Sequence, residues 1–391
     1  MRTLLVFASL LVSAGLFAAE PIHRLDGGTI SPEQIDATVT RLMKAAEVPG
    51  LGVAVIDDGK VVYLKGYGFR DVEKKLPYTP DTVAYAASFT KSAFAYMVLQ
   101  LVDERSLDLD RPVYGYLPKP LLEYDDYKDL AGDERWKKIT ARMLLSHTSG
   151  LPNLRRFEDD QKVHIHFEPG SRYAYSGEGL KLLQLVIETI AKQPLQQLME
   201  KRVFEPFGMT RTSMVWNAEF EDNFANGYDE NGRNLGPDRR KSAGAAGSMV
   251  TTIRDFSRFL QLVMHGDRLS PKMHSEMLKA QVRIHAQHEF PTFENKATHA
   301  NDAIRLSYGL GWGLYWSPYG EAFFKEGHDD GWRNYTVAFS DSGKGMIIMT
   351  NSGNGEGIFK ELLEAVLKDS FTPIEWEGYT PYQQLPPRQS K

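Results

Sequence analysis

Segments with the character of β-strands stand near both ends of this chain, and a long stretch of helical character separates them. Near the N-terminus, residues 51–56 and 61–66 are β-rich runs joined by the turn-forming sequence Asp57-Asp58-Gly59-Lys60. Far along the chain, residues 335–339 and 346–350 flank a short polar stretch in the same manner. The arrangement predicts that the two ends of the chain meet in one antiparallel sheet.

The middle of the chain carries apolar residues at helical spacing, for example in residues 181–191 and 253–264. Residues 358–367 show the same spacing and are expected to close the fold as a helix. We therefore expect an α/β (α+β) protein with an antiparallel sheet flanked by helices and an inserted, mostly helical lobe. A cleft is expected between the lobe and the sheet.

The length of 391 residues suits one large catalytic domain. We expect that domain over residues 20–375, followed by a C-terminal tail over residues 376–391 that is rich in Pro and Gln from residue 383 onward. Residues 281–303 are polar, contain three histidines and are expected to form a surface insertion.

The N-terminus has the pattern of a secretory signal peptide over residues 1–19. Arg2 precedes an apolar stretch over residues 4–17, and Ala18-Ala19 forms a small-residue exit. The alternative is an uncleaved anchor, although the stretch is short for a membrane span. The chain has no Cys, which excludes disulfides and fits export to a bacterial envelope. We expect a periplasmic or secreted protein.

The charge balance argues against two kinds of partner. A formal net charge of −5 gives no indication of binding to nucleic acid or to an anionic membrane surface. A small-molecule or peptide substrate is the expected partner.

Ser88 and Lys91 form the first chemical motif, at the start of an apolar segment expected to be a buried helix. Residues three apart share a helix face, so the two side chains can touch. Burial lowers the pKa of a lysine, which can then take the proton of the serine hydroxyl. In the alternative interpretation, Ser88 caps the helix and Lys91 is solvated, and the pair alone does not exclude it.

Tyr175 is the second candidate, ahead of a predicted helix. A tyrosine beside a Ser/Lys pair can relay a proton to a leaving group, and we expect the nearby cation to lower the pKa of its phenol. The alternative is an ordinary core tyrosine, one of 18 in the chain.

Lys325-Glu326-Gly327 is the third candidate, just before a predicted strand. A lysine on a sheet edge can hold a substrate carboxylate, and the glycine beside it can leave room for the substrate backbone. A solvated edge lysine is the alternative. A second register would start the motif at His328, but it loses the glycine.

Taken together, Ser88-Phe89-Thr90-Lys91, Tyr175-Ser176-Gly177 and Lys325-Glu326-Gly327 resemble the three motifs of the penicillin-recognising serine hydrolases. Their order and spacing resemble the class C β-lactamase branch, which also holds D-alanyl-D-alanine carboxypeptidases, D-aminopeptidases and related esterases. The family-like stretch Ser146-His147-Thr148-Ser149-Gly150 extends the resemblance, which covers roughly residues 48–367. It implies a β-lactamase/transpeptidase-like fold, with Ser88, Lys91 and Tyr175 as catalytic residues.

The resemblance also implies that Lys325, Gly327 and His328 bind the substrate, and that the backbone N–H groups of Ser88 and His328 form the oxyanion hole. Two positions depart from the family pattern. Gly177 replaces a customary asparagine, for which Glu178 is a candidate substitute, and Glu326 replaces a hydroxyl residue and puts an anion beside Lys325. The loss of the asparagine argues against amide substrates, β-lactams included, and Glu326 is expected to weaken recognition of a substrate carboxylate.

We therefore expect a serine hydrolase that forms an acyl-enzyme on Ser88 and needs no metal or organic cofactor. Esters or D-amino-acid peptides and amides are the leading substrates, with β-lactams as a further candidate. The alternative is a non-turning penicillin-binding or cell-wall-sensing protein on the same scaffold. His164 and His166 have the spacing of metal ligands, but no partner completes the set. The sequence does not indicate an oligomeric state.

Overall fold

The computed structural model describes residues 21–293 and 296–385. The expected signal peptide, residues 1–19, lies outside the described residues. Among the residues described, no helix combines the length and apolarity needed to cross a membrane.

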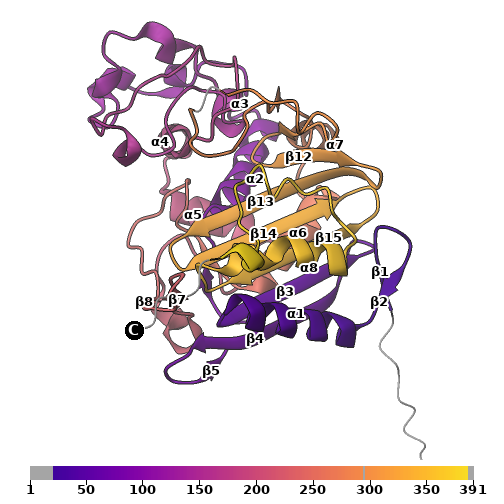
Figure 1. Cartoon of the computed structure of the whole chain (residues 1–391). Coiled ribbons are helices and arrows are strands. Elements are labelled where there is room, and N and C mark those ends of the chain that lie inside the picture. Colours follow the sequence, from indigo (N-terminus) through magenta and orange to yellow (C-terminus); the bar gives the residue numbers. More distant parts are fainter. Residues whose placement is uncertain (1–20, 294–295, 386–391) are drawn as a thin grey trace, which may run out of the picture.

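A nine-stranded sheet forms the centre of the molecule, and every neighbouring pair in it is antiparallel (Figure 1). Its strands, in spatial order, are β10 (Val282–Arg283), β11 (Ser307–Tyr308), β12 (Gly313–Ser317), β13 (Gly320–Asp329), β14 (Trp332–Phe339), β15 (Lys344–Thr350), β3 (Gly50–Asp57), β4 (Lys60–Asp71) and β5 (Leu76–Pro77). The last long strand of the chain, β15, pairs with the first, β3, with Met346 opposite Val55. The predicted meeting of the two chain ends in one sheet is confirmed.

The sheet separates two apolar cores, because successive side chains of a strand point to opposite faces. On β3, Val53 and Val55 pack with α1 (Pro32–Ala46) and α8 (Phe359–Val366), whereas Ala54 and Ile56 pack with α2 (Phe89–Asp103) and α6 (Ile253–His265). In Figure 1, α1 and α8 cross the near face of the sheet and α2 lies behind it. Both faces are covered, so all eight positions of β3 are buried.

Local sequence explains where the flanking helices begin. Ser31 caps α1 and forms a capping box with Gln34, and Pro32 stands at the first helical position, where its missing N–H has no cost. Helix α2 is different, because every residue from Phe89 to Leu101 is buried, polar ones included. A helix that is buried all round belongs to the core of the protein, and α2 carries the Ser/Lys motif through it.

The inserted lobe is helical in shorter pieces than the sequence predicts. Its longer helix is α4 (Gly177–Ala191), which contains the predicted segment 181–191. The remaining helices of the chain are α3 (Ala141–Leu145), α5 (Leu195–Met199), α7 (Pro271–Met277), the π-helix η6 (Glu200–Phe204) and the 3-10 helices η1 (Val113–Tyr116), η2 (Leu121–Glu123), η3 (Lys128–Leu130), η4 (Glu134–Lys138), η5 (Arg155–Phe157), η7 (Ala218–Asn223), η8 (Gly355–Ile358) and η9 (Tyr382–Gln384).

Short strand pairs fasten the periphery of the fold. They join β1 (Ile22–His23) to β2 (Thr29–Ile30), β6 (Ala84–Tyr85) to β9 (Val250–Thr251), and β7 (Gly227–Tyr228) to β8 (Asn234–Gly236). The β6–β9 pair includes β6, which lies just before Ser88 in the sequence. It brings together the segment just before Ser88 and the segment that returns from the lobe.

The packed domain continues beyond residue 375, although the tail was expected to start at residue 376. Trp376 and Tyr379 are buried in the core on the α1 and α8 face, and Glu377 is buried between them. The start of the expected tail, residues 376–379, therefore contributes to the core of the domain, whereas residues 380–385 are half-buried or exposed.

Candidate active site

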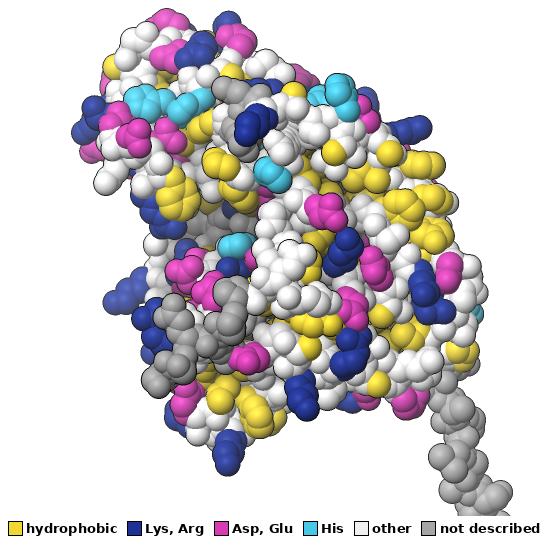
Figure 2. All heavy atoms as spheres, viewed as in Figure 1, with side chains coloured by type: hydrophobic (Ala, Val, Ile, Leu, Met, Phe, Trp, Pro, Cys, Tyr) yellow, Lys and Arg dark blue, Asp and Glu magenta, His cyan; other side chains and the backbone are white. Residues whose placement is uncertain are grey.

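A cleft of about 930 Å³ opens between the helical lobe and the sheet, and it contains the predicted catalytic residues. Ser88, Lys91 and Tyr175 all line it. Figure 2 shows the surface hollowed below the lobe, with side chains of both charges near the opening. Tyr175, which is far from Ser88 and Lys91 in the sequence, thus meets them in one place.

Ser88 stands at the N-cap of α2, where its side chain makes no capping hydrogen bond. The residue before it, Ala87, has a φ of +48°, a left-handed conformation that costs a residue with a Cβ about 1–2 kcal/mol. Thr90 holds this turn in place, because its hydroxyl donates to the carbonyl of Ala87 (2.6 Å) and accepts from the N–H of Met249 (3.0 Å). Backbone strain of this kind is characteristic of functional positions.

Lys91 is 4% exposed and directs its amine at Ser88. Its Nζ lies 2.9 Å from Ser88 Oγ and also donates to the carbonyl of Ala246. Burial lowers the pKa of Lys91 to about 7, and the positive charge of Lys325 acts in the same direction. A substantial fraction of Lys91 is therefore neutral near pH 7, so the lysine can accept the serine proton. The predicted depression of its pKa is confirmed.

Tyr175 lies over both lysines, with Lys91 Nζ 4.7 Å and Lys325 Nζ 4.9 Å from its ring centroid. The expectation that these cations lower the pKa of the phenol is wrong. Burial raises that pKa well above its usual value, and the charge of Glu326 adds to the effect. Complete burial destabilises a phenolate more than the two cations stabilise it, so Tyr175 is a neutral phenol that can donate a proton.

His147 holds Tyr175 in position from behind. Its Nδ1 accepts the N–H of Ser176 (3.1 Å), and its ring stacks on Tyr175 at 4.5 Å between centroids. Burial, together with the charges of Lys325 and Lys91, lowers the pKa of His147 well below its usual value. The imidazole is therefore neutral and acts as a hydrogen-bond acceptor, which is a structural role.

Lys325 does not present its charge to the cleft. Its side chain is completely buried, and its Nζ pairs with Glu326 and donates to Tyr175 OH at 3.3 Å. Glu326 lines the cleft, whereas Lys325 is not among the residues that do. An ammonium group whose charge is balanced by a neighbouring carboxylate attracts a substrate carboxylate less strongly, as the departure at Glu326 predicts.

Gly327 was predicted to leave room for the substrate backbone, but the structure gives a different reason for a glycine at this position. A Cβ at this position would lie 2.6 Å from the carbonyl oxygen of Ala86, closer than real Cβ contacts come. Strand β13 therefore passes directly against the segment that leads to Ser88. The missing side chain makes room for the protein's own backbone, and Gly327 does not line the cleft.

His328 lies at the mouth of the cleft. Its side chain is 49% exposed, and its Nδ1 lies 3.5 Å from Glu356 Oε2. The imidazole is thus half exposed to solvent. The resemblance assigns the backbone N–H of His328, and not its side chain, to the oxyanion hole.

The structure explains the departure at Gly177. A Cβ there would lie 2.6 Å from the carbonyl oxygen of Asn153 and 3.2 Å from its Oδ1. Asn153 lines the cleft, so an amide side chain is present beside Gly177 although it comes from another segment. Glu178 does not substitute for the missing asparagine. It is fully buried outside the cleft, where it pairs with Arg155 (2.9 Å) and Lys181 (2.8 Å).

Besides Asp329 and Asp330, which are more exposed, two buried carboxyl groups line the cleft that sequence reasoning missed. Glu289 is 3% exposed and accepts from Tyr173 OH (3.2 Å), and Glu377 is 6% exposed and accepts from Tyr335 OH (3.3 Å). Glu289 lies in the expected surface insertion and Glu377 in the expected tail. A hydrogen bond from the N–H of Glu289 to the carbonyl of Trp376 (2.9 Å) joins these two segments. The polar composition of both segments gave no signal of burial.

The histidines weighed as metal ligands have other partners. His164 contacts Asp160 (2.9 Å) and His166 contacts Glu158 (2.8 Å). Throughout residues 21–293 and 296–385, no group of three or more His, Cys, Asp or Glu side chains is arranged to hold a metal ion.

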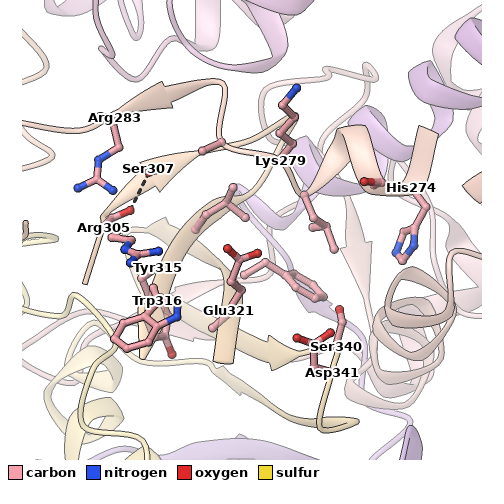
Figure 3. Close-up of a pocket in the computed structure, with 16 residues that line it drawn as sticks. His274, Lys279, Arg283, Arg305, Ser307, Tyr315, Trp316, Glu321, Ser340 and Asp341 are labelled. Carbon is pink, nitrogen blue, oxygen red and sulfur yellow. Dashed lines mark hydrogen bonds between the residues drawn. The ribbon is translucent and has the colours of Figure 1, made fainter. Parts of the chain in front are cut away.

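A second pocket, of about 430 Å³, lies beside α7 at the β11–β12 edge of the sheet (Figure 3). Arg283, Arg305 and Asp341 line it, and Trp316 contributes an apolar wall. The close-up shows no hydrogen bond between a serine and a lysine there, so the cleft with Ser88 is the candidate active site.

The fold and this site together define a protein of the penicillin-recognising serine hydrolase class, with a β-lactamase/transpeptidase-like architecture. The chain belongs to the β-lactamase family, whose model matches residues 35–369.

Two curated proteins are similar to parts of the chain. Protein flp of Staphylococcus aureus (strain MRSA252) is 29% identical over 217 residues, which cover 52% of this chain and 42% of flp. A D-aminopeptidase of Gluconobacter oxydans (strain 621H) is 27% identical over 188 residues, which cover 46% of this chain and 35% of that protein. The chain thus spans less than half the length of each of these two relatives.

Two solved structures share the fold. The octameric penicillin-binding protein homologue from Pyrococcus abyssi superposes with a TM-score of 0.69 at 22% identity, covering 91% of this chain and 79% of that one. The D-alanine carboxypeptidase AmpC from Burkholderia cenocepacia superposes with a TM-score of 0.64 at 20% identity, covering 82% and 93%. At these identities, the likeness concerns the fold alone.

Proposed function

We propose that this protein hydrolyses carboxylic esters, or peptides and amides of D-amino acids, through an acyl-enzyme on Ser88. The observation that carries the proposal is the 2.9 Å contact between Ser88 Oγ and the Nζ of a buried lysine, facing a cleft large enough for a substrate. A serine hydroxyl becomes a nucleophile when a positioned base takes its proton, and a lysine with a pKa of about 7 is such a base.

The reaction has two halves. Ser88 Oγ attacks the substrate carbonyl while Lys91 takes the hydroxyl proton, and backbone N–H groups stabilise the oxyanion. The tetrahedral intermediate then collapses and expels the leaving group, which takes its proton from the neutral phenol of Tyr175. Lys91 returns its proton to Tyr175, and water, activated by the same groups, releases the acid and restores Ser88.

The chemistry around the two lysines favours esters and D-amino-acid derivatives over β-lactams as substrates. Because Glu326 balances the charge of Lys325, the site is a poor receptor for a free carboxylate such as the one on penicillins. The similarity to a D-aminopeptidase supports the second substrate class.

The test combines labelling with turnover. A fluorophosphonate probe followed by intact-mass measurement should add one adduct to the wild type and none to Ser88→Ala. Short-chain nitrophenyl esters, nitrocefin and a D-alanyl-D-alanine peptide are then compared, and we expect the esters to exceed nitrocefin in kcat/KM. A folded protein that takes up no adduct contradicts the proposal. Normal labelling followed by very slow release of the acyl group would favour the non-turning binding protein.

We also propose that the protein acts in the periplasm or outside the cell. The proposal rests on the signal-peptide pattern of residues 1–19 and on the absence of Cys. N-terminal sequencing of the protein recovered from a cell-envelope fraction should start at Glu20. Recovery of the full-length chain from the cytoplasm alone would contradict it.

A further inference from the structure

Three carboxyl groups converge on the candidate active site, from three separate segments of the chain. Glu326 comes from β13, Glu289 from the 281–303 segment and Glu377 from the end of the domain. All three are at least nine-tenths buried, and all three line the cleft together with Ser88. The charge of Glu326 raises the pKa of both Glu289 and Glu377, and the charge of Glu289 also raises that of Glu377, so the three carboxyls lie close enough to interact.

Glu377 is the member that points to a ligand. Its Oε1 accepts the Tyr335 hydroxyl, but its Oε2 is buried and has no hydrogen-bond partner among the described residues. A buried carboxyl oxygen without a donor is costly, and native structures seldom keep one without a reason. This oxygen belongs to a residue that lines the substrate cleft, so a donor arriving with the substrate would satisfy it.

The two buried lysines of this region, Lys91 and Lys325, have other partners. Lys325 is committed to Glu326 and to Tyr175 OH, and Lys91 to Ser88 and the Ala246 carbonyl. Neither lysine hydrogen-bonds to Glu289 or Glu377. Burial and the neighbouring carboxylates raise the pKa of Glu289 to about 8 and that of Glu377 well above its usual value. Burial therefore favours the protonated form of both carboxyls, and a cation bound between them could replace such a proton.

The cation that fits is organic. The described residues contain no group of three or more acidic or histidine side chains with the arrangement of a metal site. An ammonium group instead offers three N–H donors that can reach separate carboxyl oxygens. Tyr379, which lines the cleft next to Glu377, adds an aromatic face of the kind that attracts cations.

We propose that Glu289, Glu326 and Glu377 form a binding pocket for a substrate ammonium group, so that the enzyme selects amine-bearing substrates. This inference rests on the proposed function, because it takes the cleft to be a substrate site. Such a pocket would give the enzyme a preference for a cation over a neutral or anionic group of the same shape, which the proposed catalytic residues do not provide.

The experiment compares simple probes that differ in charge alone. Ethylammonium, butylammonium and benzylammonium ions are tested as competitive inhibitors of a neutral nitrophenyl ester, beside the alcohols and carboxylates of matching length. One buried charge-assisted contact should make the best ammonium ion bind about tenfold or more tightly than its alcohol. Thermal-shift titrations with the same compounds measure binding without turnover.

Variants then assign the effect to the pocket. Glu377→Gln and, in a separate protein, Glu289→Gln should each reduce the ammonium-over-alcohol preference at least about fivefold. Glu375→Gln is the matched control, because Glu375 lies two residues before Glu377 with a side chain that is 88% exposed, and it should leave the preference unchanged. The two pocket variants guard against the case in which one of them fails to fold.

The outcomes separate this inference from the proposed function. Equal binding of ammonium ions and alcohols to a wild-type enzyme that turns over the ester overturns the pocket and leaves the hydrolase standing. An ammonium preference that survives both pocket variants also overturns it. Failure of Ser88 to take up a fluorophosphonate contradicts the hydrolase, and the thermal-shift comparison still decides whether the cleft binds ammonium ions.

Discussion

Replacing Lys91, the proposed catalytic base, should make this protein more stable while abolishing its activity. Lys91 is completely buried in an apolar helix, and burial lowers its pKa from the ordinary 10.5 to about 7. Each pH unit of such a difference corresponds to about 1.36 kcal/mol, so the wild type loses up to about 5 kcal/mol of stability at or below pH 7. Lys91→Met removes this cost but also two hydrogen bonds worth about 1 kcal/mol each, which leaves a net gain of about 2–3 kcal/mol.

The gain should depend on pH in one direction. Above about pH 10.5 the lysine is neutral in both the folded and the unfolded chain and costs nothing. As the pH falls from 10.5 toward 7, the unfolded chain binds a proton that the folded chain does not, so the wild type loses stability relative to Lys91→Met. Below about pH 7 both states are protonated, and the difference reaches its full value.

The assay is guanidinium unfolding of the wild type and of Lys91→Met at pH 7, 8 and 9. We expect the variant to unfold at a higher denaturant concentration, with the largest difference at pH 7 and a smaller one at pH 9. Lys44→Met, on the exposed side of α1, serves as the control and should change stability by less than about 0.5 kcal/mol. A variant no more stable than the wild type at pH 7, or a gain that does not shrink as pH rises, would refute the reasoning.

Three further predictions concern the site. The kcat/KM for a neutral nitrophenyl ester should fall about tenfold per pH unit below pH 7, because Lys91 must be neutral to accept the serine proton; a flat profile between pH 5 and 7 would contradict this. Tyr175→Phe should lower kcat about 100-fold and leave fluorophosphonate labelling of the serine possible, because the lost phenol is the proton donor to the leaving group; an unchanged kcat would exclude that role. Gly327→Ala should lower activity at least about tenfold, because the new Cβ would press on Ala86 just before Ser88. Gly115→Ala is the control and should be tolerated, because its Cβ would meet only a flexible arginine side chain. Equal activities of the two variants would count against the close approach.

Much of the fold followed from patterns that are local in the sequence. The hairpin around Gly59 and the strands on either side appear as β3 and β4, and the predicted helix 253–264 appears as α6, one residue longer. Hydrophobic periodicity reports directly which face of an element is buried, so these elements were predictable. The lobe was less so, because short 3-10 segments lack the length over which a period can be recognised.

The candidate site was predictable only in part, for reasons that can be named residue by residue. Ser88 and Lys91 are one helical turn apart, so their contact is a local property. The pKa of Tyr175 was predicted in the wrong direction, because its burial and the nearby charge of Glu326 arise from residues that are distant in sequence. The role of Gly327 was misjudged because nothing in the sequence shows that Ala86 passes beside it.

The sequence by itself thus determined the contact between Ser88 and Lys91, the family resemblance and the meeting of both chain ends in one antiparallel sheet. These depend on the spacing of residues within a single helix, or on hydrophobic periodicity, which does not depend on distant parts of the chain. Only the tertiary structure decided that Glu289 and Glu377, from segments taken as an insertion and a tail, enter the cleft. It also decided that Lys325 is completely buried and does not line the cleft. Burial and charge pairing arise from contacts between distant segments, so they are properties of the folded chain and cannot be read from neighbours along it.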